Sequence, residues 1–247
     1  MSQSLSIPEQ LLRRSIRVVR PRDLEGVYAN PSQEVQRLES KGVLLNLAHG
    51  YYAVPPSEWL GDPAWVPEIE TVALGIAAAD HQPTRVAIVG ISAARVLGFL
   101  PRALGTAVVA VPVRRRPLTT KVGQIHFWQR QTDELETQVW RSELGQGRVS
   151  TSEQALLDLA DRPDRGGVTL ATAQEALRNL SSAVDWERAR ALAMSQGAES
   201  SYRRARWFAD AIVPEAPVLR RPRHPVASRG LRPIEPTDRA RFGIRDD

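Results

Sequence analysis

The sequence predicts an α+β protein, in which helices frame a small sheet instead of alternating regularly with strands. Two observations favour this class. Runs with helical spacing and β-prone runs are grouped unevenly along the chain, and the β-prone runs are short and bounded by glycine or proline. The 247 residues include 42% hydrophobic and 25% charged side chains, which is ordinary for a folded protein and enough for two modest hydrophobic cores.

Shifts in composition divide the chain into four segments. Residues 1–56 mix short helical and extended patterns, and residues 57–66, rich in proline and tryptophan, indicate a linker. Residues 67–213 indicate a compact mixed domain of helices and a small sheet. Residues 214–247 are rich in proline and arginine with few large apolar groups, so they predict an irregular tail.

The first segment begins with two helices. Apolar residues at helical spacing predict a helix over residues 7–14, and a short extended piece follows at residues 16–19. Pro21 can open a second short helix over residues 22–27, with Leu24 as its apolar anchor.

A third helix and a hairpin complete this segment. Asn30 is a favourable helix cap, Pro31 a favourable first residue, and Gly42 suits the left-handed end of a helix that runs to about Ser40. Two β-prone runs around Gly50 then predict a hairpin over residues 43–54. Helix, short helix, turn, helix and hairpin within about 50 residues is the order of a winged helix-turn-helix.

The third helix is expected to present a polar face. At about 100° per residue, Val35 and Leu38 share one side, while glutamine and arginine side chains lie on the opposite side. Glutamine can bond adenine and arginine can bond guanine or phosphate, so this helix is a candidate for the major groove. The alternative is an ordinary solvated helix face. The candidate DNA contacts in and beside the helix and at the hairpin tip are Ser32, Gln33, Gln36, Arg37, Ser40, Lys41, His49, Arg20 and Arg22.

In the second segment, helical and β-prone runs are interleaved. A helix is expected to open at Thr151, where Gln154 three residues later resembles a capping box. The remaining expected elements are helices at 67–79, at about 91–98, at 186–196 and at 199–213, and strands at 85–89, 106–113 and 122–128.

The chain's net charge of +5 includes one dense cluster, Arg114, Arg115 and Arg116, between two expected strands. This loop could extend a DNA footprint, meet an acidic partner or simply be solvated. All three alternatives remain open from the sequence.

Several classes of function are excluded by residue usage. With no cysteine, the chain has no disulfides, thiol nucleophile or cysteine-ligated metal. The four histidines are scattered, and no nucleophile or phosphate-loop motif is present, so we expect no catalysis, metal or cofactor. No apolar run approaches about 20 residues and no signal peptide is evident, which favours a cytoplasmic protein without a membrane partner.

The sequence also resembles the AbiEi family of bacterial antitoxins, over roughly residues 8–213. The motifs that carry the resemblance are short: Lys41–Leu44 with Gly50–Ala53, then Ile91–Phe99, Thr151–Asp158, and Ser201–Ile212. The sequence departs from the family pattern at the hairpin tip, where Ala48 and His49 stand in place of arginine, and at Ser152, which replaces a proline.

The resemblance implies an autorepressor that binds its own double-stranded promoter and whose second domain counters a nucleotidyltransferase-like toxin. Direct contact with the toxin and self-association on DNA are left open. One alternative is a winged-helix regulator of another operon that senses a ligand or partner through residues 67–213. Another is a DNA-acting enzyme that carries a winged helix as an adaptor, but the sequence lacks the clustered acids and lysine that such an enzyme needs.

Overall fold

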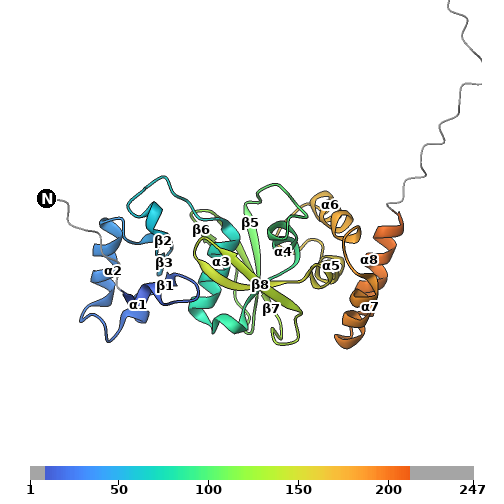
Figure 1. Cartoon of the computed structure of the whole chain (residues 1–247), viewed down its shortest axis with the longest axis horizontal. Coiled ribbons are helices and arrows are strands. Elements are labelled where there is room, and N and C mark those ends of the chain that lie inside the picture. The colour runs from blue at the N-terminus through green and yellow to red at the C-terminus, as the bar shows by residue number, and fades with distance from the viewer. Residues whose placement is uncertain (1–8, 212–247) are drawn as a thin grey trace, which may run out of the picture. The chain divides into compact units, whose positions relative to one another are not determined.

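Two short helices, a 3-10 turn and a three-stranded antiparallel sheet make up the N-terminal segment of the computed structural model, which describes residues 9–211 (Figure 1). The strand order is β1-β3-β2. The elements follow one another in the order expected from the sequence: α1 (Glu9–Leu12), β1 (Val18–Val19), a 3-10 turn (Pro21–Leu24), α2 (Pro31–Ser40), β2 (Leu45–Ala48) and β3 (Tyr51–Ala53). The start of the expected first helix and the tail at 214–247 lie outside the described residues.

Helix α2 begins and ends where the sequence predicts. It starts at Pro31, although the Asn30 side chain makes no capping hydrogen bond, contrary to expectation. It ends at Ser40, and Gly42 follows two residues later with a φ of +72°, in the left-handed region. The Val43 amide then donates to the carbonyl of Leu38 at 2.9 Å, which satisfies one of the last free carbonyls of the helix.

The N-terminal sheet has an apolar side chain on each face, because successive residues of a strand point to opposite faces. Val19 faces a small core that it shares with α2, whereas Val18 belongs to the large core of the second segment. The buried residues of the small core are Leu11, Val19, Leu24, Val35, Leu38, Val43, Leu44 and Val54. This sheet is therefore buried on both sides.

The second segment is built on a six-stranded mixed sheet of order β6-β7-β5-β4-β9-β8. Strand β5 is parallel to β7 and β4 is parallel to β9, while the other neighbouring strands are antiparallel. The strands are β4 (Ala87–Ile88), β5 (Thr106–Val111), β6 (Leu118–Thr120), β7 (Gly123–Gln129), β8 (Thr137–Ser142) and β9 (Gly145–Ser150).

Helices cover both faces of this sheet. Figure 1 shows α3 on one side and α4 with α5 on the other, and both α3 and α4 contact β5. Helices α6, α7 and α8 pack around α5. The helices are α3 (Ile69–Asp80), α4 (Gly90–Val96), α5 (Ser152–Asp161), α6 (Leu170–Ser181), α7 (Trp186–Ser195) and α8 (Glu199–Ala211), and two further 3-10 turns lie at Ser57–Trp59 and Pro83–Arg85.

Helix α3 lies between the two sheets. Every residue from 69 to 77 is buried, which is expected of a helix that is apolar on all sides. Gly75 faces the N-terminal sheet so closely that a methyl group there would overlap the side chain of Val18. On the other side, Leu74 lies against Gly147 of β9. The helix is thus part of the contact surface of both segments.

The α+β class is confirmed, but the sheet is larger than expected. Strands β6, β8 and β9 and helix α6 were not predicted. The strands carry too few apolar residues at a regular period, whereas α6 does carry alanine and leucine at helical spacing, a signal that the sequence contains. Strand β5 ends at Val111, one residue before Pro112, as a strand must when the next residue has no amide hydrogen. At the start of α5, Thr151 accepts from the Gln154 amide, but the Gln154 side chain bonds to the Glu136 amide instead of completing the capping box.

Candidate functional site

The outward face of α2 is polar along its length. Val35 is 0% and Leu38 is 3% exposed, whereas the side chains opposite them are exposed. The exposed residues of this face are Ser32, Gln33, Gln36, Arg37 and Ser40. We call this set the α2 face. Its direction follows from helical geometry once Val35 and Leu38 are fixed in the core, while its contact with DNA stays a prediction.

Arg37 on the α2 face is paired within its own helix. Its Nε donates to Glu34 at 2.8 Å, and its Nη2 also contacts that carboxylate. The bond from Arg37 lowers the pKa of Glu34, and the charge of exposed Lys41 acts in the same direction. Exposed pairs of this kind contribute little to stability. The arginine can therefore exchange Glu34 for another anion with little loss of folding free energy.

A groove of about 390 Å³ runs beside the first turns of α2. It is lined by Tyr28, Ala29, Asn30, Gln33, Glu34 and Arg37. The first turn of a helix carries unpaired amide groups and the positive end of its dipole, which favours a nearby anion. The groove joins this end of the helix to the amide and guanidinium groups of the α2 face.

The hairpin tip holds one of the candidate side chains. His49 is exposed, and Gly50 follows it with a φ of +78°, which lets β3 turn back against β2. The side-chain amide of Asn46 donates to the Ala48 carbonyl at 3.2 Å and stiffens the tip. The tip thus offers one imidazole where the AbiEi pattern has arginine.

Arg20 and Arg22 have different surroundings. Arg22 is exposed. Arg20 turns toward the second segment, where its guanidinium forms an ion pair with Asp80 at the end of α3 and lies 5.8 Å from the ring centroid of Tyr51. The expectation that Arg20 contacts DNA does not fit this placement, because its guanidinium is held in an ion pair with a carboxylate that is only 15% exposed.

The three arginines of the 114–116 loop do not form one patch. Arg114 and Arg116 are exposed, but Arg115 pairs with Asp80 and donates from Nη2 to the Tyr51 hydroxyl at 3.1 Å. The sequence could not reveal this, because the three residues look equivalent in the chain. Asp80, 35 positions away from Arg115, and the rings of Tyr51 and Phe127 distinguish this arginine from its neighbours.

Asp80 is therefore a junction between the segments, which we call the Asp80 junction. The Tyr51 hydroxyl donates to its carboxylate at 2.8 Å, and Arg20 and Arg115 pair with it from either segment. Only 15% of the Asp80 side chain is exposed. Ion pairs that are this shielded hold their geometry more firmly than surface pairs do.

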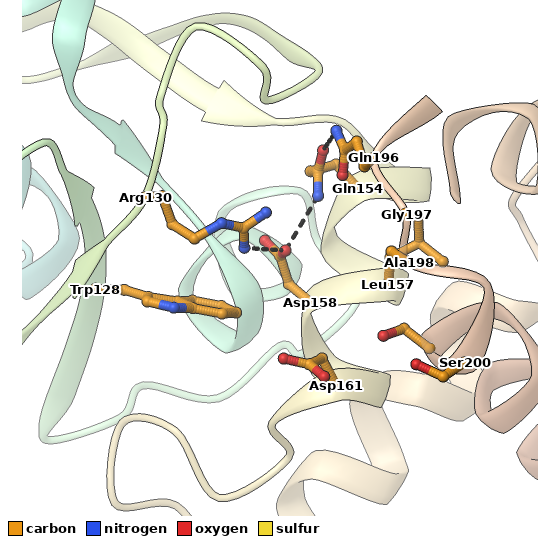
Figure 2. Close-up of a pocket in the computed structure, with 11 residues that line it drawn as sticks. Trp128, Arg130, Gln154, Leu157, Asp158, Asp161, Gln196, Gly197, Ala198 and Ser200 are labelled. Atoms are coloured by element: carbon orange, nitrogen blue, oxygen red, sulfur yellow. Dashed lines mark hydrogen bonds and ion pairs between the residues drawn. The ribbon is translucent and has the colours of Figure 1, made fainter. Parts of the chain in front are cut away.

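A second polar network lies in the helical layer (Figure 2). Asp158 of α5 is 2% exposed and accepts from Arg130 at 2.9 Å and from Gln154 at 3.1 Å. Gln196, at the end of α7, donates to Gln154 at 2.7 Å. The network borders a cavity of about 310 Å³ that also exposes Asp161 and the turn before α8.

The Figure 2 network connects elements and carries no recognisable catalytic arrangement. Burial raises the pKa of Asp158, while Arg130 and then Gln154 oppose that shift by bonding to the charged form. The bonds drawn in Figure 2 tie α5 to the residue after β7 and to the end of α7. Both bonds to Asp158 go to its Oδ1, while its Oδ2 is buried without a hydrogen-bond partner among the described residues. Sequence reasoning missed Arg130, although Asp158 lies at the end of the Thr151–Asp158 motif.

Other signals of a site are absent from the described part of the chain. Within residues 9–211 no group of three or more histidine and carboxylate side chains could hold a metal ion. No helix in that range has both the length and the apolar character needed to cross a bilayer.

The fold and the exposed helix define an α+β protein in which a small helix-and-hairpin segment is joined through a buried helix to a helix-covered mixed sheet. Residues 86–208 match the family model described as the AbiEi antitoxin C-terminal domain. The domain that these residues form therefore belongs to the AbiEi antitoxin family, and the resemblance noted from the sequence is confirmed there. The match runs from the residue before β4 into α8, so it includes the whole six-stranded sheet.

A solved structure supports the fold. The crystal structure of RV2827C protein from Mycobacterium tuberculosis is similar with a TM-score of 0.54 and 21% identity, over 82% of this chain and 74% of that one. At this identity the likeness shows the fold alone. No curated protein matched the sequence.

Proposed function

We propose that this chain is a DNA-binding antitoxin that represses its own operon and counters a nucleotidyltransferase-like toxin. In this proposal residues 1–56 are a winged helix-turn-helix, residues 57–66 a linker and residues 67–213 the antitoxin domain, with the tail at 214–247 outside the described residues. The protein acts in the cytoplasm and has no catalytic activity or cofactor of its own.

One observation carries the DNA-binding part of this proposal: the α2 face is exposed beside a two-stranded hairpin. Helix α2 has 10 residues, a length of about 15 Å, and a B-DNA major groove is about 12 Å wide. In the groove, Gln33, Gln36 and Arg37 reach base edges. Ser32, Ser40, Lys41, Arg22 and, at the wing, His49 contact phosphates, which fixes position without reading sequence.

Two copies are expected to occupy a repeated site, with one α2 in each half-site. The half-sites are then separated by one helical turn of DNA or a multiple of it.

A second function, regulation of an unrelated operon, is the alternative. The family match favours the antitoxin, because it falls on the domain that the alternative would use for sensing.

The DNA-binding proposal is tested by fluorescence anisotropy with the promoter upstream of the chain's own gene. The triple variant Q33A/Q36A/R37A should lose its preference for the promoter over a scrambled duplex, since each good base contact is worth about 1–3 kcal/mol. The matched control is Arg190→Ala, an exposed arginine of α7 far from α2 in sequence. Equal promoter preference in the triple variant and the wild type would remove the α2 face from the proposal.

The antitoxin proposal needs a separate readout. Co-expression with the toxin encoded beside it should restore growth in both the wild type and the triple variant, because the antitoxin domain is unchanged. A chain that binds its promoter but never restores growth would support the alternative regulator. Since α3 packs on both segments, point variants are preferable to deleting residues 1–56.

A further inference from the structure

A second cavity, with a different character, lies where β7 meets the turn after α5. Its volume is about 340 Å³, within the range of small-molecule sites. Side chains of His126 on β7 and of Arg162 and Arg165 in the turn line it, and Pro117 closes it from the 114–117 loop. We call it the β7 pocket. It shares no lining residue with the α2 face or with the cavity of Figure 2.

Arg165 in the β7 pocket forms no ion pair with any described residue. Its guanidinium lies 4.2 Å from the ring centroid of Trp128, and no carboxylate in residues 9–211 is within ion-pair distance of it. Its Nε is buried without a hydrogen-bond partner among the described residues. Burial and the nearby charge of Arg162 lower the pKa of Arg165. Unpaired buried donors are uncommon in folded proteins and point to a missing acceptor.

The other charges around the β7 pocket leave it positive. Arg162 has only a 3.9 Å contact with the carboxylate of Asp161, and 61% of its side chain is exposed. Asp164 is the one carboxylate that lines the pocket, and its charge partly offsets that of Arg165. Burial and the charge of Arg165 lower the pKa of His126, so at neutral pH the imidazole is a neutral polar group.

Two glycines shape the pocket. Gly166 and Gly167 have φ values of +95° and +68°, so the turn reverses sharply after Arg165. A side chain at Gly166 would come within 2.7 Å of Val108 on the sheet. A side chain at Gly167 would stand 3.8 Å from His126 Nε2 and occupy the space in front of the imidazole. The backbone therefore keeps this space open beside the two arginines.

We propose that the β7 pocket binds the phosphate group of a small phosphate ester. Two guanidinium groups border one cavity, and their donors suit an anion with three terminal oxygens better than a planar carboxylate. The imidazole of His126 adds a polar wall, because its Nε2 already bonds to Gln124 Oε1 at 3.1 Å. The volume exceeds that of phosphate itself, which leaves room for the ester's remaining atoms. The site is independent of the proposed function, because none of its residues belongs to the α2 face.

Binding is tested by isothermal titration of the full-length chain with AMP and inorganic phosphate, with acetate as the comparison anion. One AMP should bind per chain, and acetate should not bind. Arg165→Gln should weaken AMP binding by about tenfold or more, and exposed Arg162→Gln by roughly threefold, in line with the loss of charge-assisted hydrogen bonds. The control Arg178→Gln, at an exposed arginine of α6, should bind AMP as the wild type does.

The results divide clearly. No heat of binding at millimolar AMP, or equal binding by the wild type, R162Q and R165Q, overturns the proposal. Where R165Q fails to fold, as judged by circular dichroism, R162Q decides alone. A competing DNA duplex distinguishes two sources of the phosphate: displacement of AMP assigns the pocket to the DNA backbone, and simultaneous binding assigns it to a free ester.

Discussion

At the residue scale, two shielded carboxylates, the partly buried Asp80 and the buried Asp158, organise much of the polar structure. Asp80 gathers Arg20, Arg115 and Tyr51 from three parts of the chain, and Asp158 gathers Arg130 and Gln154 within the helical layer. Each carboxylate is shielded from water, so its partners are fixed in direction. The two sites also differ, since Asp80 joins the segments while Asp158 lies within one of them.

Removing the charge of Asp80 should destabilise the whole protein. Asp80→Asn keeps the shape but leaves Arg20 and Arg115 facing each other without a counter-ion. We expect a loss of about 2–3 kcal/mol in the free energy of unfolding, measured in urea. Asp161→Asn is the control, because its side chain is 44% exposed, and it should change stability by less than about 1 kcal/mol. Equal effects of the two variants would contradict the Asp80 junction.

The pH dependence of stability should carry a contribution from Asp158. Burial raises its pKa, so the folded chain holds this proton more tightly than the unfolded chain does. The proton on Asp158 therefore stabilises the folded state at low pH. This stabilisation is lost as pH rises above the unfolded-state pKa of about 4 and through the folded-state pKa. The difference in unfolding free energy between the wild type and Asp158→Asn should decrease over that range. A difference that grows with pH would reverse the sign assigned here.

At the element scale, α2 shows how a short helix is fixed by its ends and its buried side. The helix begins at Pro31, the left-handed Gly42 follows its C-terminal end, and Val35 and Leu38 orient it. The exposed side chains make no contribution to this placement, so they are available for recognition. Because different residues place the helix and face outward, residues of the α2 face can be substituted without loss of the fold.

The C-terminal end of α2 should be sensitive to a single methyl group. Gly42→Ala places a side chain in the left-handed region, and the added atom would lie 3.0 Å from the Cα of Gly61. Gly50→Ala has a similar φ, but nothing lies within 4 Å. We expect Gly50→Ala to cost about 1 kcal/mol and Gly42→Ala at least about 1 kcal/mol more, by urea unfolding. Identical losses would show that the contact with Gly61 is unimportant.

At the scale of the whole molecule, α3 makes the two segments energetically dependent. Its buried residues contact the N-terminal sheet on one side and the six-stranded sheet on the other. The backbone adds to this connection, because the Arg17 amide donates to the Leu144 carbonyl at 2.8 Å and the Gln146 amide to Ser15 at 2.7 Å. The DNA-binding and antitoxin segments that we propose are thus not independent modules.

A double-mutant cycle at Gly75 and Val18 measures this dependence. Gly75→Ala improves helix propensity by about 1 kcal/mol, yet the clash with Val18 should make it destabilising by about 1–3 kcal/mol. In the Val18→Ala background the same change should cost at least about 1 kcal/mol less, because the overlapping atoms are gone. Additive effects, read from urea unfolding, would mean that the sheet and helix do not touch at this point.

The sequence was sufficient to predict an element wherever the residues that define the element lie within it or directly beside it. The α+β class, both ends of α2, the hairpin and the start of α5 could all be predicted, because proline, glycine and alternating apolar residues act locally. The polar strands β8 and β9 gave no such signal, since they are defined by pairing with each other and with β4. Their existence depends on neighbours distant in sequence.

The sequence alone thus determined which side of α2 is polar and which residues it offers, because a helix buried through Val35 and Leu38 has only one outward face. The tertiary structure decided which arginines remain available. Arg20 and Arg115 look like their neighbours in the chain, but both pair with Asp80, whereas Arg165 forms no ion pair with any described residue. The reason is physical: the state of a charged side chain depends on the charges that folding brings within a few ångströms of it.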